Sequence, residues 1–493
     1  MAPRRDDERR PLLLQHHPSV DHGPQEEAVQ FEQDDPENPR LWPKFWKYAI
    51  VLQIFFLALV CPMASSIFAP AASAIADSLG TSTQIVEIGQ TTFVIMLGLG
   101  PLFLAPMSET FGRRPVFLTN LAVFTVLQIP IALAPNVATF VVFRTFSGLC
   151  GSVGVANGGG AISDMFETHE RAMVLGFYLV APLLGPSLGP LLGGLISDAL
   201  GWRWIFWVLL VLAAIVTTVC YFFLYETNAM ILLQQRKTEL EKQNKDKKYT
   251  VDGVPDQPMF KRMAKNSTRA LRILNTQPIV LTMSTYQALI FSTMYSLYSE
   301  YATIFSGGSA RHPTPYHFST TQIGLLYSGS CIGFILTAVI VVLYIDKVYT
   351  YYSEKNDDDG KPEYRLPLAN IGALSLPISL FWFGWSVDQG DPWPVPWAAT
   401  LLFGAAQVSI FNTCQTYYID AFESQAASAV AAGASLRSVV GGVVPLFVSG
   451  LFERLGYGLG MSVFGALSVV LMPAPVLFQW YGEGIRERFP FEG

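Results

Sequence analysis

Apolar and polar residues follow one another along this chain in long blocks. Runs of roughly twenty mostly apolar residues, enough to cross a hydrocarbon core about 30 Å thick, recur about twelve times. They lie near residues 47–69, 84–107, 115–134, 138–161, 172–197, 203–224, 277–304, 321–345, 367–387, 396–419, 427–452 and 457–481. This pattern predicts an all-α membrane protein with twelve transmembrane helices.

Polar segments divide the twelve runs into two groups of six. We expect a disordered tail, an N-terminal bundle, a central loop, a C-terminal bundle and a short tail, at residues 1–46, 47–225, 226–275, 276–482 and 483–493. The stretch KTELEKQNKDKK in the central loop alternates in charge, which favours a solvated linker or a short solvated helix. The predicted plan is therefore two six-helix bundles joined by a polar loop.

Charged residues are scarce and unevenly placed. They make up 14% of the chain, against about 25% in a typical soluble domain. Lys and Arg gather in the two tails, the central loop and alternate connections, whereas the other connections hold only Arg203, Arg311 and Arg454. Because positive residues favour the cytoplasmic side, we expect both termini and the central loop to be cytoplasmic. The net charge of −6, without a basic face, excludes a nucleic-acid partner.

The cysteines and histidines predict no metal, cofactor or catalytic site. All five cysteines lie in apolar runs, where buried free thiols are expected, and all six histidines lie in tails or connections. No metal-ligand spacing and no nucleotide-binding loop is present in the sequence. The sequence therefore argues against an enzyme and against an ATP-driven pump.

A first motif lies in the connection between the second and third runs. APMSETFGRRPVF, residues 105–117, combines Glu109 and Gly112 with the pair Arg113 and Arg114. Gly112 suits a tight turn, and the Glu109 carboxylate can meet the arginines or cap the helix that follows.

Arg144 lies several residues inside the fourth run. A charge at such a depth costs about 2.5–3.5 kcal/mol on insertion scales, so we expect Arg144 to face an interior cavity or an acid. Gly148, Gly151 and Ser152 would let a neighbouring helix approach. A purely structural role for the arginine is the alternative.

The fifth run contains APLLGPSLGPLLGG, residues 181–194, which is rich in residues that break helices in water. Gly185, Gly189 and Gly193 fall on one helical face and permit close packing. Prolines at every fourth position from residue 182 form a second stripe, and the carbonyls that they free must be satisfied inside the bundle. We therefore expect a helix that bends only where neighbours surround it.

These three motifs resemble those of the major facilitator superfamily, and within it the fungal drug:proton antiporter branch. The first resembles the loop signature G-x-L-a-D-r-x-G-r-k, from which Ala105, Glu109 and Thr110 depart. The second resembles R-x-x-q-G, and the third resembles G-x-x-x-G-P-x-x-G-G with Ala181 in the first glycine position. Further marks of the family are the stretches at residues 35–39, 201–204 and 417–421.

The resemblance implies a role for each motif. The first would gate access through Glu109, Gly112, Arg113 and Arg114, and Arg144 would take part in proton transfer. The third is associated with exporters and would consist of Gly185, Pro186, Gly189, Pro190, Gly193 and Gly194. The resemblance implies the twelve-helix facilitator fold for nearly the whole chain.

Polar and aromatic residues of the seventh and tenth runs are candidates for a substrate cavity between the bundles. They are Gln287, Phe291, Tyr295, Tyr298, Gln407, Asn412 and Gln415. An aromatic and amide lining suits an amphipathic organic molecule and lacks the acids that a polycation would favour. Ordinary packing between helices is the alternative explanation.

Few ionisable residues lie in or beside the apolar runs, and these are the candidates for proton coupling. They are Glu87, Arg144, Glu300, Asp420 and Arg437. Glu300 lies near the outer end of its run and Asp420 near the inner end of its own, and burial would make either carboxyl a plausible proton carrier. Arg437 lies deep in the eleventh run, where it could neutralise an acid or attract an anionic substrate.

The sequence thus favours a secondary transporter that exports a small amphipathic drug, toxin or metabolite in exchange for protons by alternating access. An importer or facilitator is the main alternative, and a transporter-like receptor is another. We expect a monomer whose partners are the substrate, protons and lipid, in the plasma membrane. The pattern of Glu8, Leu12 and Leu13 resembles an acidic dileucine signal, which adaptors would read for vacuolar or endosomal sorting.

Overall fold

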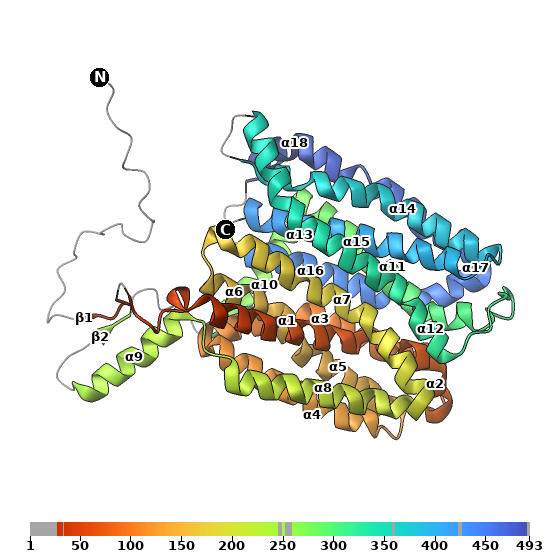
Figure 1. Cartoon of the computed structure of the whole chain (residues 1–493), viewed down its shortest axis with the longest axis horizontal. Coiled ribbons are helices and arrows are strands. Elements are labelled where there is room, and N and C mark those ends of the chain that lie inside the picture. The colour runs from red at the N-terminus through yellow and green to blue at the C-terminus, as the bar shows by residue number, and fades with distance from the viewer. Residues whose placement is uncertain are drawn as a thin grey trace.

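The computed structural model describes residues 27–32, 34–244, 249–251, 259–356, 360–422 and 426–490 of the chain. The described chain is almost entirely helical, and its long helices lie side by side in one bundle (Figure 1). The proposed sorting residues Glu8, Leu12 and Leu13 lie outside the described residues.

The first six predicted runs form the first half of the bundle. Its helices are α1 Lys44–Ser66, η3 Ala69–Ala71, α2 Ala72–Leu79, α3 Thr83–Phe111, α4 Arg113–Ala132, α5 Val137–Gly151, α6 Val153–Met165, α7 Thr168–Leu200 and α8 Trp202–Phe223. The fourth run is divided between α5 and α6, which meet at Ser152. All six runs are therefore helical, as the apolar pattern predicts.

The second six runs form the second half. Its helices are α11 Pro278–Phe305, α12 Thr320–Leu326, α13 Ser328–Asn356, η4 Pro362–Arg365, α14 Pro367–Asp388, α15 Pro394–Ala421, α16 Ala426–Val443, α17 Pro445–Leu471 and α18 Ala474–Arg488. Gly456, with φ 80°, breaks α17 into two helical pieces. The eleventh span is therefore α16 with the first piece of α17, and the twelfth is the second piece with α18.

Two of the twelve spans are unusual in composition or length. Among the described residues, ten helical segments are long and apolar enough to cross a membrane, and α11 is not one of them. The apolar part of α16 is also short, at Ser428–Val443. Every residue of α11 from Tyr286 to Tyr301 is buried, so this polar helix is surrounded by protein and lies at the centre of the bundle.

The central loop contains more helix than the sequence predicts. The helix α9, Ala229–Gln243, takes in the start of the charged stretch and extends away from the bundle (Figure 1). The helix α10, Met259–Thr276, lies against α3 and α16 instead of forming part of a plain linker. The short strand β1, Glu27–Ala28, pairs in parallel with β2, Tyr249–Thr250, and η2, Pro39–Leu41, leads into α1.

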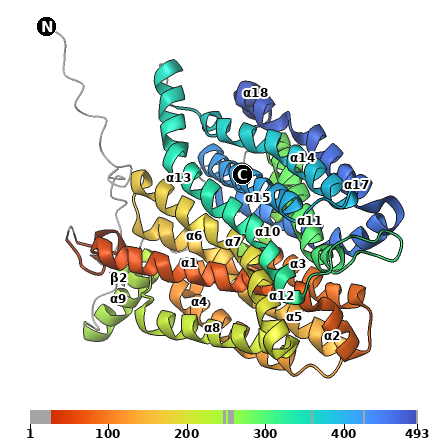
Figure 2. The same cartoon turned by 45° about the vertical axis from the view of Figure 1, so that its right-hand side comes forward.

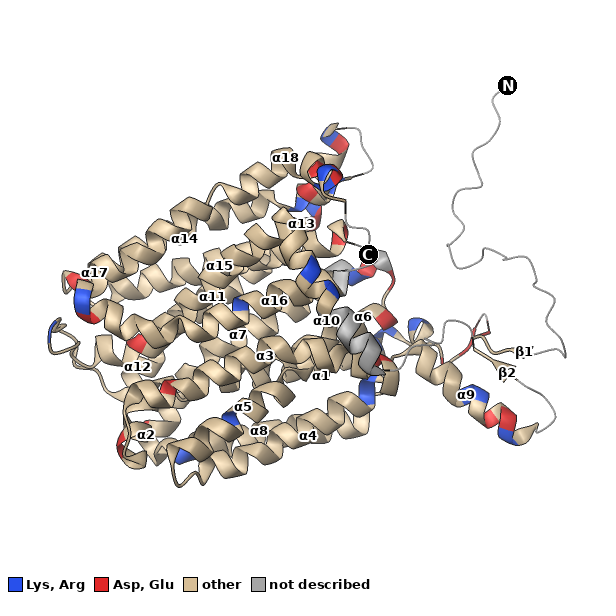
Figure 3. Cartoon of the chain, turned by 180° about the vertical axis from the view of Figure 1, so that it is seen from behind, with Lys and Arg blue, Asp and Glu red and all other residues tan. Residues whose placement is uncertain are grey.

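The start of α1 and the end of α18 lie at one end of the bundle (Figure 1), which we name the terminal end; the opposite end is the far end. Charged residues gather at these ends, and the long helices between them are almost free of charge (Figure 3). Each half has its own apolar core, and the second-half core also takes in Val94, Leu183 and Leu184 of the first half. The halves lie side by side, with α3 against α16 and α7 against α12 and α13 (Figure 2).

Candidate functional site

The glycine face of α7 packs against α1. A Cβ atom added to Gly185 would lie 2.6 Å from the Leu59 carbonyl oxygen, and one added to Gly189 would lie 2.6 Å from that of Met63. At Gly193 the added atom would come within 1.7 Å of the Ile67 oxygen. No side chain fits at these positions without moving backbone, so the helix that the glycines approach is α1.

The prolines of α7 lie inside a continuous helix, and a neighbour satisfies a carbonyl that they free. Pro190 has no N–H to donate to the carbonyl of Pro186. The Ser66 hydroxyl of α1 donates to that oxygen at 2.5 Å. Bundle neighbours therefore replace the missing intrahelical bond, as the low polarity of a membrane requires.

Arg144 on α5 holds the end of α1. The last carbonyls of a helix have no intrahelical donors, and α1 ends at Ser66. Arg144 is fully buried, and its Nη1 and Nη2 donate to the carbonyl oxygens of Ala64 and Ser65 at 2.6 and 3.0 Å. Its guanidinium also lies over the rings of Phe68 and Phe93, at 4.7 and 4.4 Å from their centroids. The cation thus lies at the negative end of the α1 dipole.

The α1 segment held by Arg144 also contacts the second half. The Ser65 hydroxyl and the Tyr295 hydroxyl of α11 are 3.0 Å apart and share a hydrogen bond. A second such bond joins Ser187 of α7 to Tyr298 of α11. Two of the predicted cavity residues therefore form polar contacts between the halves.

A small cavity lies between the two halves beside these contacts. Its volume is about 20 Å³, and a buried water needs at least about 10–15 Å³ of such volume. It is lined by Pro62, Leu97, Gly98, Val155, Pro182, Leu183, Phe291, Tyr295, Phe411, Ala434, Arg437 and Ser438. The halves must separate before an organic molecule can enter.

The structure divides the predicted cavity residues. Phe291 and Tyr295 line the central cavity, whereas Asn412 lines a separate space of about 10 Å³. Gln287, Gln407 and Gln415 are buried in the second half without lining either of these two cavities.

Three kinds of residue that line the central cavity were not predicted from the sequence. Phe411 and Ser438 come from α15 and α16, and the first half contributes mainly apolar residues and prolines such as Pro62 and Pro182. For Phe411 the sequence held one signal: it follows the candidate Gln407 by one helical turn and so shares its helix face. An apolar lining residue cannot be told from a core residue in sequence.

The acidic candidates occupy different surroundings. Glu87 of α3 and Glu300 of α11 are both buried, and their carboxylates are close enough to interact electrostatically. The Ser449 hydroxyl donates to Glu300. Asp420 instead pairs with Arg365 at 2.9 Å, and its side chain is 31% exposed. Asp420 is therefore less buried than Glu87 and Glu300, and it is paired with a cation.

The turn between α3 and α4 is capped from α8. Gly112 has a φ of 102°, which favours glycine, and a Cβ there would lie 2.5 Å from the Glu226 Oε2. The Glu226 carboxylate accepts from the N–H groups of Arg113 and Arg114 at 2.9 and 3.0 Å. The acid that accepts from these two N–H groups is therefore Glu226, just after α8.

The Arg113 side chain has partners of its own. Its Nε lies 3.1 Å from a carboxylate oxygen of Asp164 on α6, and its Nη1 donates to the Ser108 hydroxyl at 2.6 Å. Arg113 therefore forms an ion pair with Asp164 of α6. These bonds tie α3, α4, α6 and the end of α8 together at the terminal end.

Comparison with known proteins decides the family. A model described as "Major Facilitator Superfamily" matches residues 54–445. The chain belongs to the major facilitator superfamily. Two similar relatives are "Uncharacterized transporter mfc1" of Schizosaccharomyces pombe, 34% identical over 93% of this chain and 94% of its own, and "MFS-type efflux pump MFS2" of Trichophyton rubrum, 34% identical over 94% and 77%. The chain is therefore a multi-pass membrane transporter rather than an enzyme.

Solved structures of the superfamily share the fold. The partially occluded, inward-open form of the xylose transporter XylE from E. coli superposes with a TM-score of 0.64 at 16% identity, covering 88% of this chain and 97% of that one. A bacterial homologue of the human lysosomal transporter Spinster gives 0.59 at 13% identity, covering 92% and 100%. The twelve-helix facilitator fold is thus confirmed.

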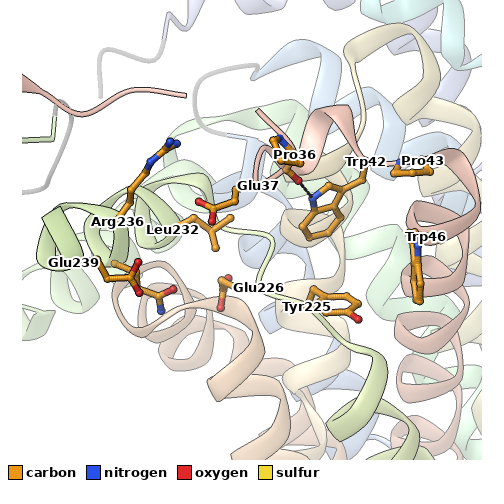
Figure 4. Close-up of a pocket in the computed structure, with 11 residues that line it drawn as sticks. Pro36, Glu37, Trp42, Pro43, Trp46, Tyr225, Glu226, Leu232, Arg236 and Glu239 are labelled. Atoms are coloured by element: carbon orange, nitrogen blue, oxygen red, sulfur yellow. Dashed lines mark hydrogen bonds between the residues drawn. The ribbon is translucent and has the colours of Figure 1, made fainter. Parts of the chain in front are cut away.

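A larger cavity, outside the helix bundle, is present among the described residues of this superfamily member. It measures about 510 Å³ and lies between the tail and the connection from α8 to α9 (Figure 4). Its edge is held by the ion pair between Asp35 and Arg236, and the Trp42 Nε1 donates to the Pro36 oxygen at 3.1 Å. Burial raises the pKa of Asp35, but the Glu37 N–H and Arg236 together lower it below its usual value. The residues that line it come from the tail, α1, the connection after α8, and α9, so it does not lie between the two halves.

Removing the Glu226 cap is expected to destabilise the terminal end. Glu226→Ala should lower the free energy of unfolding by about 1 kcal/mol, as loss of a helix cap does. Thermal unfolding of the purified protein measures the change, and Glu239→Ala, an exposed acid on α9, is the matched control. Equal midpoints for the two variants would contradict the capping role.

Proposed function

We propose that this transporter exports a small amphipathic organic compound, a drug, toxin or secondary metabolite, in exchange for protons. The observation that carries the proposal is the closed cavity between the halves, lined by aromatic rings and one buried arginine. Such a lining suits an apolar body with a polar group, and its position suits a site exposed to each side in turn.

The proposed direction is outward. The glycine and proline motif of α7 resembles that of exporters, and its glycines lie directly on the α1 backbone. "Efflux pump vrtL" of Penicillium aethiopicum is 33% identical over 92% of this chain and 88% of its own. We take the name of that relative as support for export here, without its substrate.

We place the terminal end in the cytoplasm and the protein, as a monomer, in the plasma membrane. The terminal end holds most of the Lys and Arg residues (Figure 3), as the positive-inside rule expects of a cytoplasmic face. At the far end the Thr321 hydroxyl of α12 donates to the Asp198 carboxylate of α7 at 2.6 Å, and Gly194 lies against Gly324. These contacts would separate when the site opens outward.

A proton gradient would supply the driving force. One pH unit provides about 1.4 kcal/mol per proton, and 100 mV adds about 2.3 kcal/mol for each net charge moved. In reconstituted liposomes we expect substrate to collapse an imposed pH gradient and an imposed gradient to accelerate substrate flux. Both responses are measured with a pH-sensitive dye and a labelled substrate. Substrate flux that is indifferent to the gradient would refute antiport.

Glu87 and Glu300 are the proposed proton carriers. They are buried acids of opposite halves, so a movement of the halves relative to each other would change the environment of both. We expect Glu87→Gln or Glu300→Gln to reduce gradient-driven flux at least tenfold while retaining substrate binding. Asp77→Asn, an exposed acid on α2, is the control. Unchanged coupling in both variants would exclude these carboxylates as carriers.

A further inference from the structure

Arg437 of α16 is a buried cation whose donors are not used. It is 6% exposed, and its Nε and Nη1 have no hydrogen-bond partner among the described residues. No acid in the described part of the chain forms an ion pair with it. Its charged N–H groups have left water without replacement bonds, which is costly in a membrane interior.

Arg144 offers a direct comparison within the same molecule. Both are deeply buried arginines, one in each half. Arg144 donates from both terminal nitrogens to backbone carbonyls, and so has a structural task. Nε and Nη1 of Arg437 donate to no such carbonyl among the described residues. The unused N–H groups of Arg437 therefore lack an acceptor, which an oxygen atom of a ligand would supply.

Two aromatic rings hold the Arg437 guanidinium beside the central cavity. Its centre lies 5.1 Å from the Phe291 ring centroid and 4.9 Å from that of Phe411. The guanidinium lies within cation–π distance of both rings, whose centroids are 5.9 Å apart, so both rings lie on one side of it. The same three residues line the cavity, so the unused donors of Arg437 lie beside it.

Other charged or titratable groups near Arg437 do not neutralise it. The groups that interact with it electrostatically are the hydroxyls of Tyr418, Tyr295 and Tyr178. Tyr178 and Tyr295 have their own hydrogen-bond partners, the Gly154 oxygen at 2.6 Å and the Ser65 hydroxyl at 3.0 Å. The cavity lining contains no Asp or Glu. Its only formal charge is therefore positive.

We propose that the transported compound is an organic anion: a planar apolar body with a carboxylate or another anionic oxygen group, which Arg437 binds. This inference rests on the proposed export function and adds the substrate class. A carboxylate accepts two parallel N–H bonds from a guanidinium, which would satisfy the unused donors. The apolar body would lie against Phe291, Tyr295 and Pro182.

The test compares acids with their uncharged methyl esters. The probes are 2-naphthoate and biphenyl-4-carboxylate, each beside its methyl ester, with the purified full chain in lipid nanodiscs at pH 7.5. Thermal stabilisation across a titration gives each Kd. We expect each acid to bind at least tenfold more tightly than its ester. Equal or tighter binding of the esters, or no binding of either acid at millimolar concentration, would overturn the proposal.

Variants of Arg437 assign the preference to this side chain. Arg437→Gln should abolish the preference for acids, so that each acid binds no more tightly than its ester. Arg437→Lys should retain part of the preference, because lysine keeps the charge but not the paired donors. Arg454→Gln, an exposed arginine on α17, is the charge-matched control and should keep the full preference. If Arg437→Gln does not fold, the lysine variant decides: an undiminished preference there overturns bidentate binding.

Binding and coupling fail separately in these experiments. Acid binding that depends on Arg437, combined with flux indifferent to pH, would retain the substrate class and remove proton antiport. Proton-driven flux of neutral compounds, without a preference for acids, would retain proton antiport and remove the organic-anion substrate class.

Discussion

Replacing Arg144 by alanine is expected to abolish transport while leaving the protein in the membrane. The substitution leaves the carbonyls of Ala64 and Ser65 without donors in a buried site, at a cost of roughly 1–3 kcal/mol each. It also frees the α1 segment that contacts Tyr295 of the other half. Since about 1.4 kcal/mol corresponds to a tenfold change in rate, a loss on the order of a hundredfold or more is expected.

Substrate flux in liposomes, normalised to the amount of folded protein, measures the Arg144 effect. Arg144→Lys keeps the charge but cannot donate to two carbonyls in a fixed plane, so it should recover only part of the flux. Arg203→Gln, an exposed arginine at the start of α8, is the control and should transport normally. Normal flux in Arg144→Ala would show that α1 holds its position without this arginine.

Gly193→Ala is expected to cause the second large loss, although it adds a single methyl group. The new Cβ would lie 1.7 Å from the Ile67 carbonyl oxygen, so α1 and α7 would have to move apart. Overpacking of this kind costs typically about 1–3 kcal/mol. We expect a lower thermal midpoint and loss of transport, measured on the same purified sample.

Gly450→Ala is the matched control for Gly193. Gly450 lies within α17, and a Cβ added there would have no neighbour within 4 Å. Alanine favours helix over glycine by about 1 kcal/mol, so this variant should be as stable as the parent or more stable. Similar losses in both variants would mean that helix flexibility, rather than the contact with α1, is what Gly193 provides.

The sequence predicted the spans well because membrane thickness sets their length. Even the division between the eleventh and twelfth spans, predicted between residues 452 and 457, falls at Gly456. It could not predict α10, because a polar amphipathic helix is stabilised by what it lies against and not by its own hydropathy. Nor could it identify the partner of α7, since spacing defines a glycine face but not the helix that meets it.

Only some of the polar and aromatic members of the candidate site were predictable. Phe291, Tyr295 and Arg437 carried a signal because aromatic and charged residues interrupt apolar runs. Pairing was not predictable, because it depends on distance in space: Glu226 caps the helix assigned to Glu109, and Arg365 neutralises Asp420. In the same way, only the structure distinguishes Arg144, which is hydrogen-bonded to backbone, from Arg437.

The small volume of the central cavity has a consequence for leakage. Protons cross membranes readily along a continuous file of hydrogen-bonded waters, and a space of about 20 Å³ holds about one water. Between the described helices, this space therefore does not hold the file of waters that proton leakage would need. We expect ions to cross such a transporter only in steps that open the site to one side.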